Sequence, residues 1–199
     1  MLERSDPRRP LLFLPRIPDN RDMIRIPPAA LVLLIGMSGS GKSTFASRHF
    51  DADAVVSSDR LRGLLAGDEA DQQATEAAFG RLHAWLDARL AAGALAVVDA
   101  TNVEWMRRSE LISFARHHGR PAIAIALDVP LELCLARNAS RQRTVRAAIV
   151  RRQHDELHKS LDRLDLEGFS AVHIMRNQAE IEGVAVEIEK GPAARALSS

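Results

Sequence analysis

One stretch decides the predicted fold: it reads LVLLIGMSGSGKSTFA and spans residues 31–46. Its first five residues are all apolar, which is typical of a strand buried on both faces of a parallel sheet. The next eight, Gly36 to Ser43, follow the pattern G-x-x-x-x-G-K-[ST]. The glycines let the backbone curl so that several N–H groups point toward phosphate oxygens. The sequence therefore predicts a strand, a phosphate-binding loop and a helix in direct succession.

The phosphate loop assigns expected roles to individual residues. We expect Lys42 to contact the β- and γ-phosphates of a nucleotide and the Ser43 hydroxyl to hold Mg²⁺. The residues expected to bind ATP or another NTP are Gly36, Ser38, Gly39, Ser40, Gly41, Lys42, Ser43 and Thr44. Hydrolysis, phosphoryl transfer and switching all use such a loop, so it does not identify the reaction by itself.

The segments that follow alternate between short apolar runs and longer helical patterns. The further strands are expected at 54–56, 95–98, 122–127 and 171–175, and the helices at about 72–92, 104–118, 130–138 and 144–165. Strands that alternate with helices predict an α/β fold in which helices flank a parallel sheet, here of five strands.

Composition sets the limits of the folded part. Residues 1–30 hold six of the nine prolines, and proline disfavours helix interiors and central strands. We therefore expect an irregular N-terminal arm over residues 1–29, a folded domain over 30–190, and a flexible C-terminal tail over 191–199.

The whole chain is globular in composition, with 46% hydrophobic residues, 27% charged residues and a formal net charge of +1. This balance excludes wholesale disorder and a uniformly basic nucleic-acid coat. The single cysteine, Cys134, excludes an internal disulfide, suits a reducing compartment and is expected to be buried packing. No apolar run approaches 18 residues, so we expect no membrane association and a cytoplasmic protein.

Three polar residues follow the second and third predicted sheet strands. Asp59 is a candidate general base for an attacking hydroxyl, and Arg62, at i+3, could clamp an anionic group on the acceptor. The alternative is that Asp59 caps a helix and Arg62 pairs with it. Asp99, at the end of the third strand, is the candidate carboxylate for Mg²⁺, although it could instead cap the next helix.

An arginine-rich segment follows the fourth predicted strand. Residues 134–163 carry eight Lys or Arg residues against three Asp or Glu residues. Arg137 and Arg141 share one helix face at i, i+4, so we expect them to deliver charge to the transferring phosphate from a helical lid over about 137–163. A solvated helix face and a nucleic-acid backbone contact are the alternatives. Trp105 is expected to pack rather than to stack on a base.

These motifs resemble the polynucleotide 5′-hydroxyl kinases, most of all the kinase domain of the bacterial RNA end-healing-and-sealing enzymes. The resemblance covers about residues 30–190. The matching stretches are GMSGSGKSTFA (36–46), VVSSDRLRGLL (55–65), GDEADQQAT (67–75), VVDATNV (97–103) and RNASRQRTV (137–145).

The resemblance implies transfer of the γ-phosphate of ATP, or of another NTP, to the 5′-hydroxyl end of RNA or DNA with Mg²⁺. It implies that Asp59 is the general base, that Arg62 contacts the phosphate beside the acceptor nucleoside, and that Arg137 and Arg141 contact the ATP phosphates. It also implies a strand order of 2-3-1-4-5. We expect any phosphatase or ligase partner to be a separate protein.

Two other functions remain open at this point. A P-loop kinase for a small-molecule hydroxyl would share the phosphate loop, Asp59 and the lid, and would differ in its acceptor cleft. A nucleotide-binding switch module would bind NTP without transferring phosphate, and it would not depend on Asp59. The sequence leaves the oligomeric state open.

Overall fold

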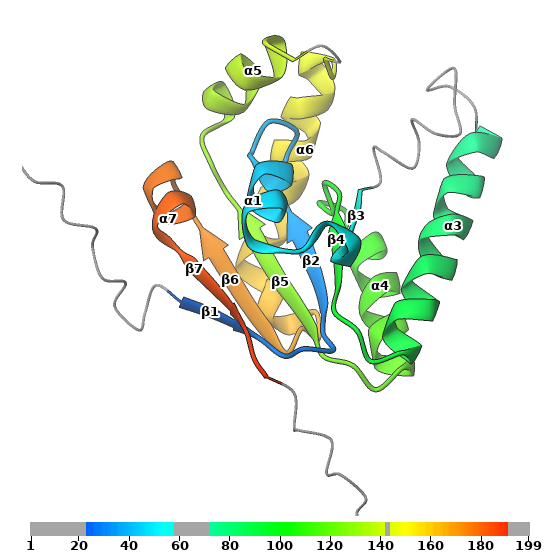
Figure 1. The fold of residues 1–199 in the computed structure, drawn as a ribbon. Coiled ribbons are helices and arrows are strands. Elements are labelled where there is room, and N and C mark those ends of the chain that lie inside the picture. Colours follow the sequence, from blue (N-terminus) through cyan, green and yellow to red (C-terminus); the bar gives the residue numbers. More distant parts are fainter. Residues whose placement is uncertain (1–22, 58–71, 142–143, 191–199) are drawn as a thin grey trace, which may run out of the picture.

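The structure of the chain is a computed structural model, which describes residues 23–57, 72–141 and 144–190. Five parallel strands form the main sheet (Figure 1). They are β2 (Leu31–Ile35), β3 (Val55–Ser57), β4 (Ala96–Asp99), β5 (Ala122–Leu127) and β6 (Ala171–Met175), in the spatial order β3-β4-β2-β5-β6. Counted along the chain this order is 2-3-1-4-5, which confirms the predicted fold class and the strand order that the resemblance implied.

The apolar strands form the centre of the sheet because both of their faces are covered. Every residue of β2 is buried, and successive side chains point to opposite faces. Leu31 and Leu33 share a core cluster with Leu86 of α3 (Gln72–Ala91) and Leu111 of α4 (Trp105–His117). Val32 and Leu34 belong to the opposite cluster, with Phe45 of α1 (Lys42–His49) and Cys134 of α5 (Leu131–Ala139). Helices therefore flank both faces of the sheet, as expected.

The long predicted helix over 144–165 is divided into two parts. The α-helix α6 covers Ala147–Ser160, and the last turns form the 3-10 helix η3 over Leu161–Leu166. The remaining short elements are the 3-10 helix η2 (Ala52–Ala54) and the helix α7 (Gln178–Gly183). In the described part of the chain, no helix is long and apolar enough to cross a membrane.

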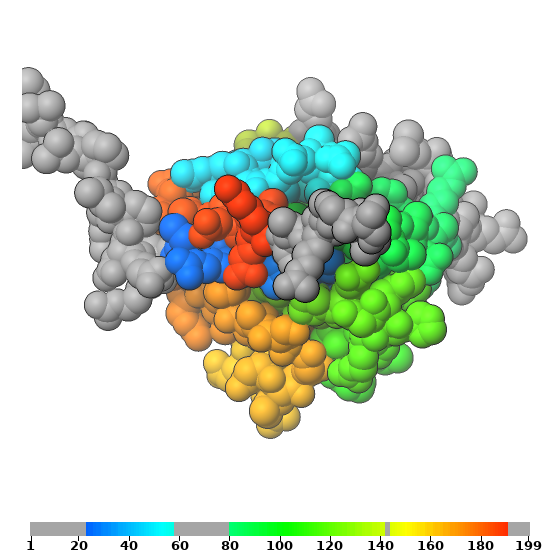
Figure 2. Space-filling model, turned by 60° about the horizontal axis from the view of Figure 1, so that its bottom comes forward, coloured from blue at the N-terminus to red at the C-terminus, as the bar shows by residue number. Residues whose placement is uncertain are grey.

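The expectation of an irregular segment over 1–29 is wrong for residues 23–26. These residues form the strand β1 (Met23–Ile26), which pairs in parallel with β7 (Ala185–Ile188). Ile24 and Ile26 are 4% and 0% exposed, and they join the core on the α1 side of the sheet. Figure 2 shows β1 and β7, in blue and red, side by side on the surface. The strand forms because its alternating isoleucines bury against the sheet, while the two prolines lie just beyond it.

The parallel register brings the carboxyl ends of the strands to one edge. Asp99, the last residue of β4, lies opposite Leu34 of β2 and Ser57 of β3. The phosphate loop leaves β2 at this same edge. In open α/β sheets, ligands bind at the carboxyl ends of the strands, so this edge positions the candidate site.

Candidate functional site

The phosphate loop connects β2 to α1 in a conformation that needs glycine. Gly39 has φ +89°, and a Cβ atom there would lie 2.4 Å from the carbonyl oxygen of Cys134 on α5. No side chain fits so close to backbone, so glycine lets the loop pack against α5. The other end of the loop is anchored by the Gly36 N–H, which donates to the Thr101 carbonyl at 2.9 Å.

Lys42 lies across the phosphate loop. Its ammonium donates to the carbonyl oxygens of Gly36 and Met37, at 2.8 and 2.9 Å, and approaches Ser40 Oγ at 3.3 Å. The residue is only 8% exposed, although it is a lysine. A positive charge is thereby fixed beside the backbone N–H groups that the sequence assigned to phosphate binding.

Ser43 and Asp99, the two predicted metal ligands, lie together although 56 residues separate them. The Ser43 hydroxyl donates to Asp99 Oδ2 at 2.7 Å, and Asp99 is 7% exposed. Mg²⁺ prefers oxygen ligands and commonly uses one or two protein oxygens together with phosphates and water. A hydroxyl and a buried carboxylate beside the phosphate loop therefore fit Mg²⁺.

The predicted lid arginines lie across a cavity from the phosphate loop. Arg137, in the last turn of α5, and Arg141 line this cavity of about 390 Å³ together with Gly39, Gly41 and Thr44. Arg137 also donates to Gln178 Oε1 of α7 at 2.9 Å. The structure thus brings two guanidinium groups and the phosphate loop to one cavity.

A lid residue that the motifs did not indicate contacts the loop directly. Gln153 of α6 accepts a hydrogen bond from the Ser38 backbone N–H at 2.8 Å. Because 115 residues separate the two, only the fold reveals this contact. It attaches the helix of the predicted lid to the loop that it would close over.

A second group missed by sequence reasoning supports the loop after β4. Arg108 is fully buried, and it donates to the carbonyl oxygens of Asn102 and Val103 at 2.9 and 2.7 Å. It also forms a two-point ion pair with Glu167, at 2.7 and 2.5 Å. Arg108, Leu111, Ile112 and Ala115 follow the i, i+3, i+4, i+7 spacing of a helix face that packs in the core. The arginine in this apolar pattern is the feature of the sequence that indicates a buried charge.

Asn102 connects the loop after β4 to the central strand. Its Nδ2 donates to the Leu34 carbonyl at 2.8 Å, and its φ of +47° is a conformation that asparagine tolerates better than most residues. The loop supported by Arg108 is thus attached to β2, immediately before the phosphate loop.

Four further residues were assigned roles from the sequence, and the structure describes two of them. Asp59 and Arg62 lie outside the described residues, so their roles stay predictions. Cys134 is buried, as expected, and burial raises the pKa of its thiol. The expectation that Trp105 packs is wrong: it is 58% exposed, and it lines a cavity at the start of α4.

Comparison with known proteins supports the fold. A family model described as an AAA domain (AAA_33) matches residues 31–164, which is more than half of the chain. No curated protein matches the chain.

Solved structures with the same fold include two chains from Pnkp1/Rnl/Hen1 complexes. The first, from an RNA repair complex, is 21% identical with a TM-score of 0.62, and the match covers 68% of this chain and 46% of that one. The second is 25% identical with a TM-score of 0.50, covering 59% and 41%. This chain therefore spans less than half the length of either.

A putative kinase from Chloroflexus aurantiacus also matches, with 14% identity, a TM-score of 0.51, and coverage of 74% of this chain and 87% of that one. At this identity the likeness concerns the fold alone. The fold, a parallel five-stranded sheet flanked by helices, is that of P-loop kinases.

Proposed function

The chain belongs to the AAA domain family AAA_33, and on that premise we propose that it is a polynucleotide 5′-hydroxyl kinase. In this proposal it transfers the γ-phosphate of ATP, or of another NTP, to the 5′-hydroxyl end of RNA or DNA. The observation that carries phosphoryl transfer is the cavity that residues of the phosphate loop line together with Arg137 and Arg141.

Charge stabilisation is the main task of such a site. Phosphoryl transfer passes through a loose transition state, so catalysis depends on positioning and on cations near the phosphate oxygens. Lys42 supplies one such cation from the start of α1, and Arg137 and Arg141 supply two more from α5 and the segment just after it. Ser43 and Asp99 would hold Mg²⁺, which when bound neutralises phosphate charge.

The acceptor side of the proposal rests on sequence. Asp59 comes two residues after Ser57, the last residue of β3 and the register partner of Asp99, and we propose that it accepts the proton of the attacking hydroxyl. Arg62 would pair with the phosphate next to the acceptor nucleoside, because a guanidinium group can fork onto two phosphate oxygens. A neutral small-molecule acceptor would offer Arg62 no such charge.

The polynucleotide acceptor is supported by the quoted motifs and by the Pnkp1 chains. Those chains come from complexes with Rnl and Hen1, one of which is described as an RNA repair complex. We propose a comparable role in nucleic-acid end repair, with a phosphatase or ligase supplied by a separate protein. We also propose that the enzyme acts in the cytoplasm, where a free Cys134 stays reduced.

Label transfer tests this function directly. The protein is incubated with Mg²⁺, γ-labelled ATP and one oligonucleotide bearing either a 5′-hydroxyl or a 5′-phosphate. We expect label on the 5′-hydroxyl strand alone. Lys42→Ala and Asp59→Ala should each lower turnover at least ~10²-fold, because phosphate stabilisation or the base is lost.

The control is Lys190→Ala, which removes the same kind of side chain at an exposed position far along the chain. Its turnover should equal that of the wild type. Tight ATP binding without labelled oligonucleotide would reject the polynucleotide acceptor and favour a small-molecule hydroxyl. Normal turnover in Asp59→Ala would reject the assigned base.

A further inference from the structure

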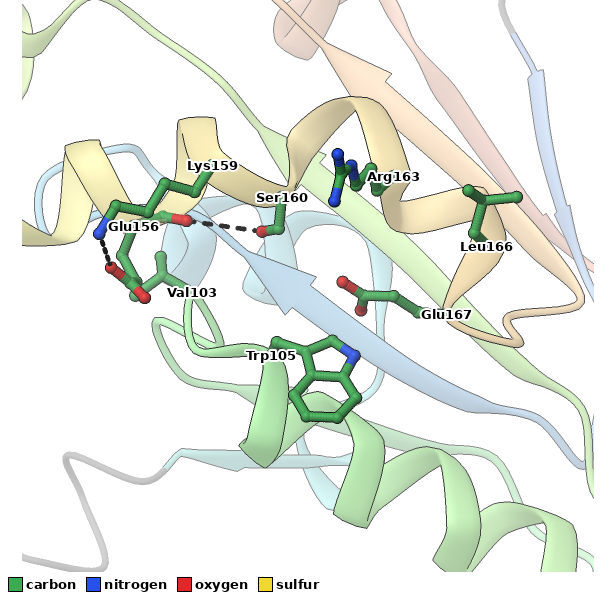
Figure 3. A pocket seen from close by; sticks show the side chains of 8 residues that line it. All are labelled: Val103, Trp105, Glu156, Lys159, Ser160, Arg163, Leu166 and Glu167. Carbon is green, nitrogen blue, oxygen red and sulfur yellow. Dashed lines mark hydrogen bonds and ion pairs between the residues drawn. The ribbon is translucent and has the colours of Figure 1, made fainter.

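An exposed tryptophan forms one wall of a second cavity. Trp105 is the first residue of α4, and Figure 3 shows it facing α6 and η3 across this cavity of about 390 Å³. The lining residues are Val103, Trp105, Glu156, Lys159, Ser160, Arg163, Leu166 and Glu167. A large aromatic side chain at the mouth of a cavity is available for stacking on a ligand.

Both walls of the cavity are attached to the phosphate loop. On one side, Val103 follows Asn102, whose amide donates to Leu34 just before the loop. On the other, Glu156 lies three residues, about 4.5 Å along the helix axis, beyond Gln153, which binds the Ser38 N–H. The segments that line the cavity are thus connected to the phosphate loop through the residues next to them.

Hydrogen bonds and an ion pair from Arg108 hold two lining residues of the cavity in place. Arg108 is fully buried behind it and binds two lining residues, the Val103 carbonyl and the Glu167 carboxylate. Because these walls are already ordered, a ligand binds without the free-energy cost of ordering them.

The charges of the lining leave one cation for an anionic ligand. Glu167 is neutralised by Arg108, and Glu156 accepts from Lys159 Nζ at 2.9 Å. Arg163 forms no ion pair with any other described residue, so its guanidinium can contact a ligand. An aromatic platform beside a cation is a pattern that binds single-stranded nucleic acid.

A protein partner fits this surface less well. Four of the eight lining residues are charged, and charged residues are depleted at the cores of protein interfaces. Nucleic acid matches both the indole and the cations.

We propose that this cavity is a subsite for the polynucleotide acceptor beyond its reacting 5′ nucleotide. In this subsite a nucleobase stacks on Trp105 while Arg163 contacts a backbone phosphate. The proposal rests on the proposed function and deepens it, because it makes the enzyme prefer single-stranded acceptors longer than one nucleotide.

Fluorescence of Trp105 tests the subsite without relying on catalysis. In a Trp85→Phe background, Trp105 is the single tryptophan of the chain. A single-stranded 5′-hydroxyl hexanucleotide should quench its emission, and the same hexamer with its bases removed should not. No quenching, or equal quenching by the base-free hexamer, would overturn the subsite.

Kinetics provide the second test. Trp105→Ala should raise KM for the hexamer on the order of tenfold, since one stacked base is lost, and should leave kcat within about twofold. The mutation should not change KM for a nucleoside 3′-monophosphate, which is too short to reach the subsite. Trp105→Phe should retain most of the wild-type affinity.

The matched control is Met106→Ala, because Met106 is adjacent and 74% exposed but does not line the cavity. An equal rise in KM for the hexamer and the mononucleotide would overturn the subsite. If phosphate is transferred but Trp105 is not quenched, the subsite fails and the kinase stands. If Trp105 is quenched but no oligonucleotide is phosphorylated, the kinase fails and the nucleic-acid subsite stands.

Discussion

Single residues of the site are constrained more by what touches them than by the motif that contains them. Gly39 occupies a variable position of the motif, but a Cβ atom there would lie 2.4 Å from the Cys134 carbonyl oxygen, so the packing of the loop against α5 requires glycine. Lys42 occupies a fixed position, and its bonds to two loop carbonyls show how its charge is placed. The motif predicts which residues matter, and the contacts give the reason.

A half-buried histidine makes the stability of the fold depend on pH. His173 of β6 has a buried Nε2 that makes no hydrogen bond among the described residues, and burial lowers its pKa. The unfolded chain, with a pKa near 6.5, therefore binds more protons than the folded one below that pH. Stability is full above about pH 6.5 and falls as the pH drops toward the folded pKa.

We expect His173→Leu to lose less free energy of unfolding than the wild type between pH 7.5 and 5.5. Urea unfolding at each pH measures the difference. The exposed His117→Gln should behave as the wild type does. The unfolding free energy of His173→Leu should still depend partly on pH, because burial also lowers the pKa of His49. Equal losses in His173→Leu and the wild type would contradict the prediction.

At the scale of elements, α4 and η3 are joined by the ion pair between Arg108 and Glu167. Arg108→Met should cost about 3–5 kcal/mol of unfolding free energy, because it leaves a buried carboxylate and two carbonyls without a donor. The double variant Arg108→Met/Glu167→Met should lose less than the sum of the two single changes, since no charge is left unpaired.

A double-mutant cycle by urea unfolding measures this coupling. The control is Arg107→Met, which removes a neighbouring, half-exposed arginine paired with Glu110 and should cost less than about 1 kcal/mol. Additive losses in the cycle would show that Arg108 and Glu167 do not act as a pair.

Some elements of the fold were predictable from the sequence, and others were not. The five strands of the main sheet and the longer helices follow from apolar runs and periodicity, so their places were found within a few residues, whereas β1, β7 and α7 were not expected. The contact of Gln153 with Ser38 and the support of Asn102 by Arg108 were not found, because each joins segments whose proximity depends on helix packing.

At the scale of the whole molecule, β1 and β7 bring the two described ends of the chain together. Ile26 is fully buried, and the Glu189 N–H donates to its carbonyl at 2.8 Å. Ile26→Ala should therefore cost about 2–5 kcal/mol of unfolding free energy, although the residue lies in a stretch that the prolines made look irregular.

Chemical denaturation of Ile26→Ala against Ile188→Ala tests this pairing. Ile188 is the register partner of Ile26 and is 39% exposed, so its replacement should cost clearly less. Equal losses would mean that burial of β1 does not contribute to the stability of the domain.

The sequence by itself determined the sheet, the phosphate loop and the residues Lys42, Ser43 and Asp99, because strand periodicity and loop chemistry are encoded locally. Tertiary structure alone decided that Ser43 meets Asp99, that Arg137 and Arg141 share a cavity with the loop, and that Trp105 lines a cavity with residues of α6 and η3. The physical reason is distance along the chain: these relations join segments that only the packing of helices on the sheet brings together.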